Sequence, residues 1–200
     1  HAYSRAGVAA FTTSTGYGIA KYDNPEELSV SDRNNIGYQY TDCPLYWISV
    51  IYLNFAEAKA EMGSLTQDDL NNSINKLQAR AGLPAMTTTP DADPANNMGV
   101  SNLIWEIRRC RRCELIMDNW YRYWDLIRWH QLDKLDSTKY PNTMLGANVS
   151  NVPDCEEATK NGYIDASDAQ IRTYEAKHYF YPIPTTQLTL NKNMKQNPGW

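Results

Sequence analysis

The sequence SNLIWEIRRCRRCELIMDNWYRYWDLIRWHQLD, from Ser101 to Asp133, decides how the rest of the chain is interpreted. It holds four of the six tryptophans, four arginines in close succession and two cysteines three residues apart. These features suggest three different functions: an aromatic ligand platform, nucleic-acid binding and metal binding. Because its apolar residues recur at helical spacing, the stretch predicts a helix capped by Ser101, a break at Asp118 and Asn119, and a second helix over Trp120–Leu132.

The basic run favours ion pairing over nucleic-acid binding. Its arginines are Arg108, Arg109, Arg111 and Arg112, which spread over more than half of a helix's circumference. Acidic residues lie within a turn or two of them, so pairs along the helix are expected. The whole chain has a net charge of −4, which gives no bulk attraction to nucleic acid or to an acidic membrane surface.

A carboxylate in the second helix fits the same structural reading. Asp125 lies three residues from both Arg122 and Arg128, an arrangement that fixes side chains rather than catalysing a reaction. The arginine fork suits bidentate pairing with carboxylates on neighbouring helices. We therefore predict structural ion pairs for Arg109, Arg122, Asp125 and Arg128.

The cysteines and tryptophans of the stretch also favour a structural role. Cys110 and Cys113 form a CxxC inside a predicted helix, without a second pair, and the three histidines are scattered. Packed free thiols are the favoured interpretation, and a strained disulfide within one helical turn stays open. The tryptophans straddle two faces, which is more typical of a core than of a ligand platform. No nucleophile elbow, Walker loop, Rossmann glycine pattern or HExxH motif appears.

Residues 1–44 lack a helical period, and glycine, proline and asparagine recur along them. We expect loops with one or two short strands, such as Gly18–Tyr22 and Ile36–Tyr40, which continue from a preceding part of the protein. Helical spacing begins at Leu45 and stops at Gly63.

Thr66 and Asp69 then form a near-capping box, with Asp in place of the usual Glu, before a second helix that ends at Gly82. The hairpin over 45–82 is similar to one tetratricopeptide-type repeat, which cannot bury its own face alone. Residues 136–175 are expected to be irregular. The final segment should start extended, bend at Pro182 and Pro184, and end in turns.

Three stretches in this order resemble a known family. They are NFAEAKAEMG…INKLQARAGLP (Asn54–Pro84), IRRCRRCEL…RYWDLIRW (Ile107–Trp129) and YPIPTTQLTLNKNMKQNPGW (Tyr181–Trp200). Together they look like the C-terminal half of the SusD/RagB family of Bacteroidetes surface lipoproteins, over about residues 45–200. The chain departs from the family pattern at Cys110, where Glu is usual, and is one residue longer between Met117 and Arg122.

The resemblance implies a mainly α fold of tetratricopeptide-like helix pairs, with long irregular loops and a few short strands. It implies a division into residues 1–44, continuing from a missing N-terminal part, and a C-terminal region over 45–200. It implies a protein on the outer-membrane surface, held by a lipid anchor absent from this chain. That protein would capture an oligosaccharide or another nutrient for a SusC-like TonB-dependent transporter. It would be no enzyme and would need no cofactor or metal.

Two alternatives stay open: a helical-repeat scaffold acting mainly through protein–protein interaction, and an intracellular repeat adaptor. If glycan binding is the function, aromatic rings in loops or at helix ends should stack on the apolar faces of sugars. The chain has fourteen Tyr and six Trp against three Phe, and Tyr and Trp suit half-wet surfaces. The candidate ligand-binding residues are Trp120, Tyr121, Tyr140 and Tyr163.

Overall fold

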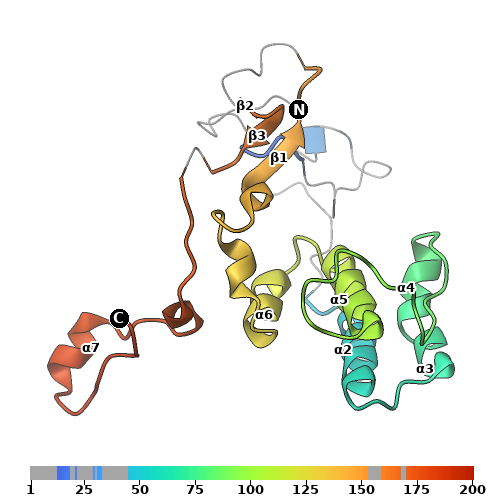
Figure 1. Ribbon diagram of the computed structural model, residues 1–200, viewed down its shortest axis with the longest axis horizontal. Coiled ribbons are helices and arrows are strands. Elements are labelled where there is room, and N and C mark those ends of the chain that lie inside the picture. The colour runs from blue at the N-terminus through green and yellow to red at the C-terminus, as the bar shows by residue number, and fades with distance from the viewer. Residues whose placement is uncertain are drawn as a thin grey trace. The chain divides into compact units, whose positions relative to one another are not determined.

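The computed structural model describes residues 13–18, 21, 29, 31–32, 45–152, 159–167 and 170–200. In these residues helices predominate and strands are few and short, as Figure 1 shows, so the predicted fold class is confirmed. The predicted strands at 18–22 and 36–40 lie almost wholly outside the described residues. None of the described helices is both long enough and apolar enough to cross a membrane. The chain forms two compact units, Cys43–Arg128 and His1–Asp42 with Trp129–Trp200, and each is described by itself.

The unit of residues 43–128 is helical. Its elements are α2 (Ile48–Glu61), α3 (Gln67–Asn71), α4 (Ile74–Arg80), α5 (Asn102–Glu114) and α6 (Tyr121–Arg128). Helix α2 packs against both α4 and α5. The core between them consists of Leu53, Ala56, Leu70, Ile74, Leu77, Met86, Ile107 and Leu115. Burying a large apolar side chain contributes about 1.5–3 kcal/mol, so this cluster is the main source of the unit's stability.

The predicted capping box is confirmed, but the helix after it is broken. The Thr66 hydroxyl accepts a hydrogen bond from the Asp69 amide at 3.1 Å, and the Asp69 carboxylate accepts one from the Thr66 amide at 2.9 Å. The prediction of one helix up to Gly82 is wrong, because α3 ends at Asn71 and α4 begins at Ile74. Between them the Ser73 hydroxyl donates to the Asp69 carbonyl at 2.6 Å, and such back-bonding competes with the helical backbone.

The predicted helices of the decisive stretch exist, with shorter limits. The Ser101 hydroxyl accepts from the Ile104 amide at 3.3 Å, which confirms the predicted N-cap. Helix α5 ends at Glu114, four residues before the expected break, and left-handed backbone follows within three residues. Helix α6 ends at Arg128 because His130 adopts a φ of 52°, and the 3-10 helix η1 (Leu132–Leu135) takes over.

The second unit contains a small antiparallel sheet where only irregular structure was expected. Strands β1 (Leu145–Asn148), β2 (Thr159–Lys160) and β3 (Tyr163–Asp165) lie in the order β1-β3-β2, with Leu145 opposite Asp165. Gly146 permits a close approach, since a Cβ there would lie 2.2 Å from the Thr15 carbonyl oxygen. That carbonyl accepts from the Ala147 amide at 2.8 Å. The missed strands are too short to show a clear alternating pattern.

The C-terminal segment of this unit also holds more structure than predicted. The 3-10 helices η2 (Pro141–Met144) and η4 (Ala176–Tyr179) precede α7 (Thr185–Leu190), a helix where only turns were expected. Pro184 leads into α7, and its restricted φ suits a helix start. The Gln196 side chain bonds both the amide and the carbonyl of Ile183, at 2.7 and 2.9 Å, and thereby closes the loop around α7.

Candidate functional site

The turn between α5 and α6 presents one predicted ligand residue and uses the other as support. Trp120 is 81% exposed. Tyr121 is half-buried: its ring meets Trp47 edge-on at 6.4 Å, and the Arg111 guanidinium carbon lies 5.7 Å from its centroid. A ring held on both sides supports the scaffold. Trp120 is therefore the member of this pair that a ligand can reach.

The backbone of this turn is strained. Met117, Asn119 and Trp120 have φ values of 64°, 33° and 58°, in the left-handed region that residues other than glycine rarely adopt. Each such residue costs on the order of 1–3 kcal/mol and persists only where the surrounding structure imposes it. The buried Asp118 lies at the centre of the turn, and its carbonyl accepts from the Tyr121 amide at 3.0 Å. Trp120, at the end of this strained turn, is exposed to solvent.

The expectation that the tryptophans of the decisive stretch are mostly core is wrong. Trp129 is buried, and Trp105 is half-buried with its indole N–H donating to Asp93 at 3.0 Å. Trp120 and Trp124 are exposed, and Trp124 follows Trp120 by one helical turn. Tyr123 meets the Trp124 ring edge-on at 5.6 Å and so fixes its orientation. Two exposed indoles therefore occur within five residues, one just before α6 and one in its first turn.

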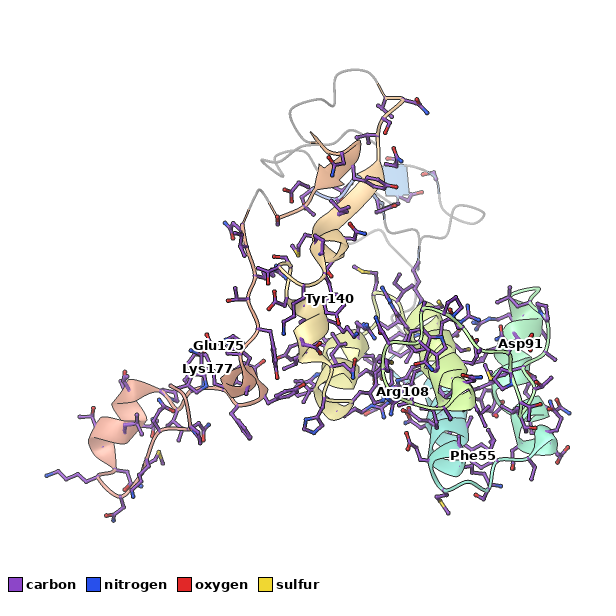
Figure 2. All side chains as sticks on the ribbon, viewed as in Figure 1. Phe55, Asp91, Arg108, Tyr140, Glu175 and Lys177 are labelled. Atoms are coloured by element: carbon purple, nitrogen blue, oxygen red, sulfur yellow. The ribbon has the colours of Figure 1, made fainter. Side chains whose placement is uncertain are left out.

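The other two predicted ligand residues lie in the second unit. Tyr140, labelled in Figure 2, is half-buried beneath Lys134, whose ammonium nitrogen is 4.5 Å from the ring centroid and 2.9 Å from the phenol oxygen. Tyr163 belongs to β3 and is exposed. The four predicted residues thus fall two in each unit.

A network of ion pairs joins the three helices α2, α5 and α6. Asp125 accepts from the Nε atoms of Arg111 at 2.7 Å and Arg128 at 2.8 Å. Glu57, on α2, accepts from Arg128 at 2.5 Å and from Arg108 at 3.3 Å, and Figure 2 labels Arg108 on α5. Both carboxylates are buried. These contacts hold the helices together.

Two residues that were predicted to form structural ion pairs, Arg109 and Arg122, are not part of this network. Arg109 pairs with Glu106 on its own helix, and its side chain is 55% exposed. Arg122 forms no ion pair with any described residue, because Arg111 and Arg128 already occupy Asp125. Burial, and secondly repulsion by Arg112, lowers the pKa of Arg122 to about 10, while Asp125 acts in the opposite sense. Sequence spacing could not identify Arg111, because its partner lies on another helix.

A groove of about 630 Å³ lies between the loop after α4 and the exposed side of α5. Its polar lining consists of Gln78, Thr87, Thr89, Asp91, Glu106 and Arg109. Leu83, Pro84 and Pro90 supply apolar surface. The groove offers donors and acceptors beside apolar patches, in the size range of small-ligand sites. It was missed in the sequence because its lining comes from a loop with no periodic pattern.

Two anchors position the loop that forms the groove. The buried Asn75 side chain accepts from the Met86 amide at 2.7 Å and donates to the Met86 carbonyl at 3.1 Å. The Asp93 carboxylate accepts from Trp105, and this hydrogen bond, followed by one from the Ala95 amide, lowers the pKa of Asp93. The groove is thus held by side chains on helices α4 and α5.

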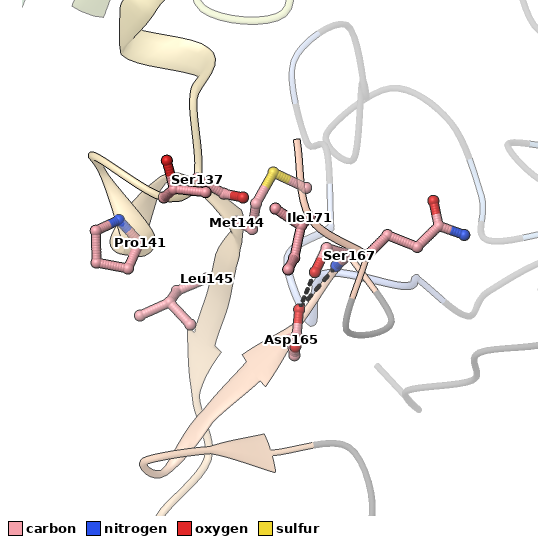
Figure 3. Close-up of a pocket in the computed structure, with 9 residues that line it drawn as sticks. Ser137, Pro141, Met144, Leu145, Asp165, Ser167 and Ile171 are labelled. Atoms are coloured by element: carbon pink, nitrogen blue, oxygen red, sulfur yellow. Dashed lines mark hydrogen bonds between the residues drawn. The ribbon is translucent and has the colours of Figure 1, made fainter. Parts of the chain in front are cut away.

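The second unit has a smaller pocket of about 230 Å³, drawn in Figure 3. Its polar groups already bond one another locally. The Asp165 carboxylate accepts from the amide and hydroxyl of Ser167 at 3.0 and 2.6 Å, and the Ser137 hydroxyl accepts from the Arg172 amide at 3.0 Å. Met144 and Ile171 supply apolar walls. This pocket is the weaker candidate, because its polar atoms are largely satisfied within the protein.

Neither cysteine of the CxxC is bridged. Cys110 packs against the core, and burial raises the pKa of its thiol to about 11. Cys113 is exposed, so the expectation of packed thiols is right for Cys110 and wrong for Cys113. Cys43 and Cys155 lie outside the described residues. Within the described part of the chain, no group of three or more His, Cys, Asp or Glu side chains could hold a metal ion.

Comparisons with known proteins agree with the motif pattern. The sequence model of one family, described as the SusD family, matches residues 1–200, including the first 44 residues that the three motifs do not reach. A SusD-like protein from Bacteroides fragilis is 25% identical, with a TM-score of 0.50, over 76% of this chain and 25% of its own. The structure of BT4246 is 28% identical, with a TM-score of 0.53, over 78% of this chain and 23% of its own. This chain therefore spans about a quarter of their length. Among the curated proteins, no match is found.

Proposed function

Because the chain belongs to the SusD family, we propose that it is part of a surface protein that binds a nutrient, most specifically an oligosaccharide. The protein would hand this ligand to a SusC-like TonB-dependent transporter and catalyse no reaction. It would sit on the outer-membrane surface, held there by a lipid anchor. Residues 45–200, with the helix hairpin at 45–82, would form the C-terminal region, and residues 1–44 would lead into it.

The observation that carries this proposal is the exposure of two tryptophans, Trp120 on the strained turn and Trp124 in the first turn of α6. Flat aromatic faces stack on the C–H faces of sugar rings, and an indole gives a large apolar contact with a polar edge. Trp120 is 81% and Trp124 55% exposed. A protein that maintains a strained backbone while exposing two indoles gives up stability at this turn, which favours a binding role.

The groove beside α5 supports the same proposal. A sugar hydroxyl both donates and accepts hydrogen bonds, and the groove holds Gln78, Thr87 and Asp91 close to the Glu106–Arg109 pair. Among the predicted tyrosines, we propose the exposed Tyr163 as a separate ligand contact within the second unit. Tyr121 and Tyr140, whose rings are already engaged, would have supporting roles.

Isothermal titration of the protein against a panel of neutral polysaccharides tests the proposal. We expect stoichiometric binding without release of reducing ends. Trp120→Ala and Trp124→Ala should each weaken binding about tenfold, because losing roughly 60 Å² of apolar contact at about 25 cal/mol per Å² costs about 1.4 kcal/mol. Trp129→Phe serves as the matched control, since Trp129 is buried. Turnover of a glycan, or equal binding by all three variants, would contradict the assignment.

The alternative, a scaffold that acts mainly through protein contacts, has one observation in its favour. Ile48, Ile51 and Phe55 of α2 and its C-cap residue Met62 recur at three-, four- and seven-residue spacing and are all exposed. Such a stripe suits packing against another helix. Co-purification with the transporter that survives loss of both exposed tryptophans, with no glycan bound, would favour the scaffold. Resistance of the native protein to protease added outside cells would instead favour an intracellular adaptor.

A further inference from the structure

The groove between the loop after α4 and helix α5 has more acidic than basic side chains in its lining. Its charged lining residues are two carboxylates, Asp91 and Glu106, and one guanidinium, Arg109. Asp91 is exposed and is labelled in Figure 2. The other polar lining residues are uncharged, and each can both donate and accept hydrogen bonds. They are Gln78, Thr87 and Thr89. The charge of this lining therefore gives no net attraction for an anion.

The guanidinium in the groove is already bound by a carboxylate of its own helix. The Nε atom of Arg109 donates to Oε2 of Glu106 at 2.9 Å, and one of its terminal nitrogens donates to the same oxygen. Hydrogen bonding to Glu106 is also the largest cause of the raised pKa of Arg109. The Glu106 side chain is 14% exposed and that of Arg109 is 55% exposed. The more buried Glu106 thus fixes the guanidinium in the wall of the groove and compensates its charge.

A third carboxylate adds to the negative charge around Arg109. Asp93 accepts hydrogen bonds from the Trp105 indole at 3.0 Å and from the Ala95 amide at 2.8 Å. The first of these contacts fixes Asp93 against α5, where Glu106 is the next residue. Its charge acts on Arg109 in the same sense as that of Glu106. A ligand carboxylate that reached Arg109 would meet these negative charges, and like charges a few ångströms apart repel each other.

We propose that the groove selects neutral saccharides against acidic ones, and that the Glu106–Arg109 pair determines this specificity. A sugar hydroxyl can donate to the carboxylate and accept from the guanidinium, so it can use both members of the pair. A ligand carboxylate can only accept, and it must compete with Glu106 for Arg109. Leu83 and Pro84 offer apolar surface for the C–H faces of the sugar rings. The inference rests on the proposed function and narrows its ligand from saccharides in general to neutral ones.

Matched pairs of polysaccharides that differ only in charge test this specificity. Pullulan, galactomannan and mixed-linkage β-glucan each form such a pair with a derivative whose primary hydroxyls have been oxidised to carboxylates. For each polymer that binds in isothermal titration, we expect the neutral form to bind about tenfold more tightly at low salt, with the difference shrinking as salt rises.

Two variants place the discrimination in the groove. Glu106→Gln keeps the length of the side chain but removes the counter-charge of Arg109, so it should raise the affinity for the acidic form about tenfold. Asp91→Asn should shift the affinity in the same direction and leaves the Glu106–Arg109 pair intact, so the inference stays testable if the first variant folds poorly. Asp68→Asn removes an exposed carboxylate from α3 and is the charge-matched control, which should keep the preference of the parent.

The possible results separate the inference from the proposed function. An acidic form that binds as tightly as its neutral partner would overturn the inference. Glu106 and Asp91 variants that fold and keep the parent's preference would also overturn it, because binding would then lie outside the groove. In both cases a saccharide is still bound, so the proposed function stands. If none of these polymers binds in either form, the oligosaccharide assignment fails and the inference fails with it.

Discussion

The Nε atom of Arg111 lies 2.7 Å from Oδ2 of Asp125, and both side chains are only 5% exposed. This contact joins α5 to α6 through two residues that are fourteen positions apart in the sequence. A buried pair of this kind is weak evidence for stability in itself, because removing two charges from water is costly. The pair instead favours one particular packing of α5 against α6, because either charge would be buried without a counter-charge if the other were removed.

Replacing Asp125 by Asn should therefore destabilise the protein by about 3–5 kcal/mol, since it leaves Arg111 buried without a counter-charge. Urea unfolding followed by circular dichroism measures this loss. The matched control is Arg109→Ala, which breaks an exposed pair within one helix and should cost about 0–1 kcal/mol. If the two variants unfold at the same urea concentration, Asp125 is not a buried partner.

The buried side-chain amide of Asn75 should stabilise the loop that forms the groove more than any residue that lines the groove. Asn75→Ala removes both hydrogen bonds to Met86 and should cost about 1–3 kcal/mol, because the Met86 backbone loses its partners. Faster proteolysis within residues 83–91 should accompany it. Asn71→Ala, which removes an exposed neighbour of the same network, is the control. Unchanged cleavage in the Asn75 variant would show that other contacts hold the loop.

Acid should weaken the fold in a defined pH window. Hydrogen bonds from the Thr138 hydroxyl, then from the Tyr174 amide, lower the pKa of Asp136 to about 2. A carboxyl whose folded pKa lies below its unfolded value stabilises the protein above the unfolded value and loses that effect as pH falls toward the folded one. Stability should therefore decline from about pH 4 to pH 2. The melting temperature of Asp136→Asn should fall less steeply over this range than that of the parent.

The two helical thiols should differ in reactivity. Burial, then the charge of Glu114, raises the pKa of Cys110 to about 11, so little thiolate exists at pH 8. In a Cys43→Ser, Cys155→Ser background, the aromatic disulfide DTNB should label one thiol quickly and the other slowly. Adding Cys113→Ser should remove the fast phase. Two fast phases, or none, would contradict the structure.

Several features could be predicted from the sequence because their causes are local. Helical periodicity, the Ser101 cap and the Thr66–Asp69 box depend on residues within one turn of each other, and all appear in the structure. The break after α3 and the helix α7 were missed. The hydrogen bond from the Ser73 hydroxyl to the Asp69 carbonyl and the hydrogen bonds of Gln196 to Ile183 cannot be predicted from hydrophobic periodicity.

By itself, the sequence determined the helical class, the family motifs and the role of the arginine run as a source of ion pairs. Only the tertiary structure decided which arginine meets which carboxylate. Asp125 pairs with Arg111 from another helix and with Arg128, and Arg122 forms no ion pair with any described residue. The tertiary structure also decided that Trp120 is exposed to solvent, on a left-handed backbone that tryptophan rarely adopts. The reason is physical: caps and helix periods are set by neighbours in sequence, whereas burial and charge pairing depend on distant segments that fold together.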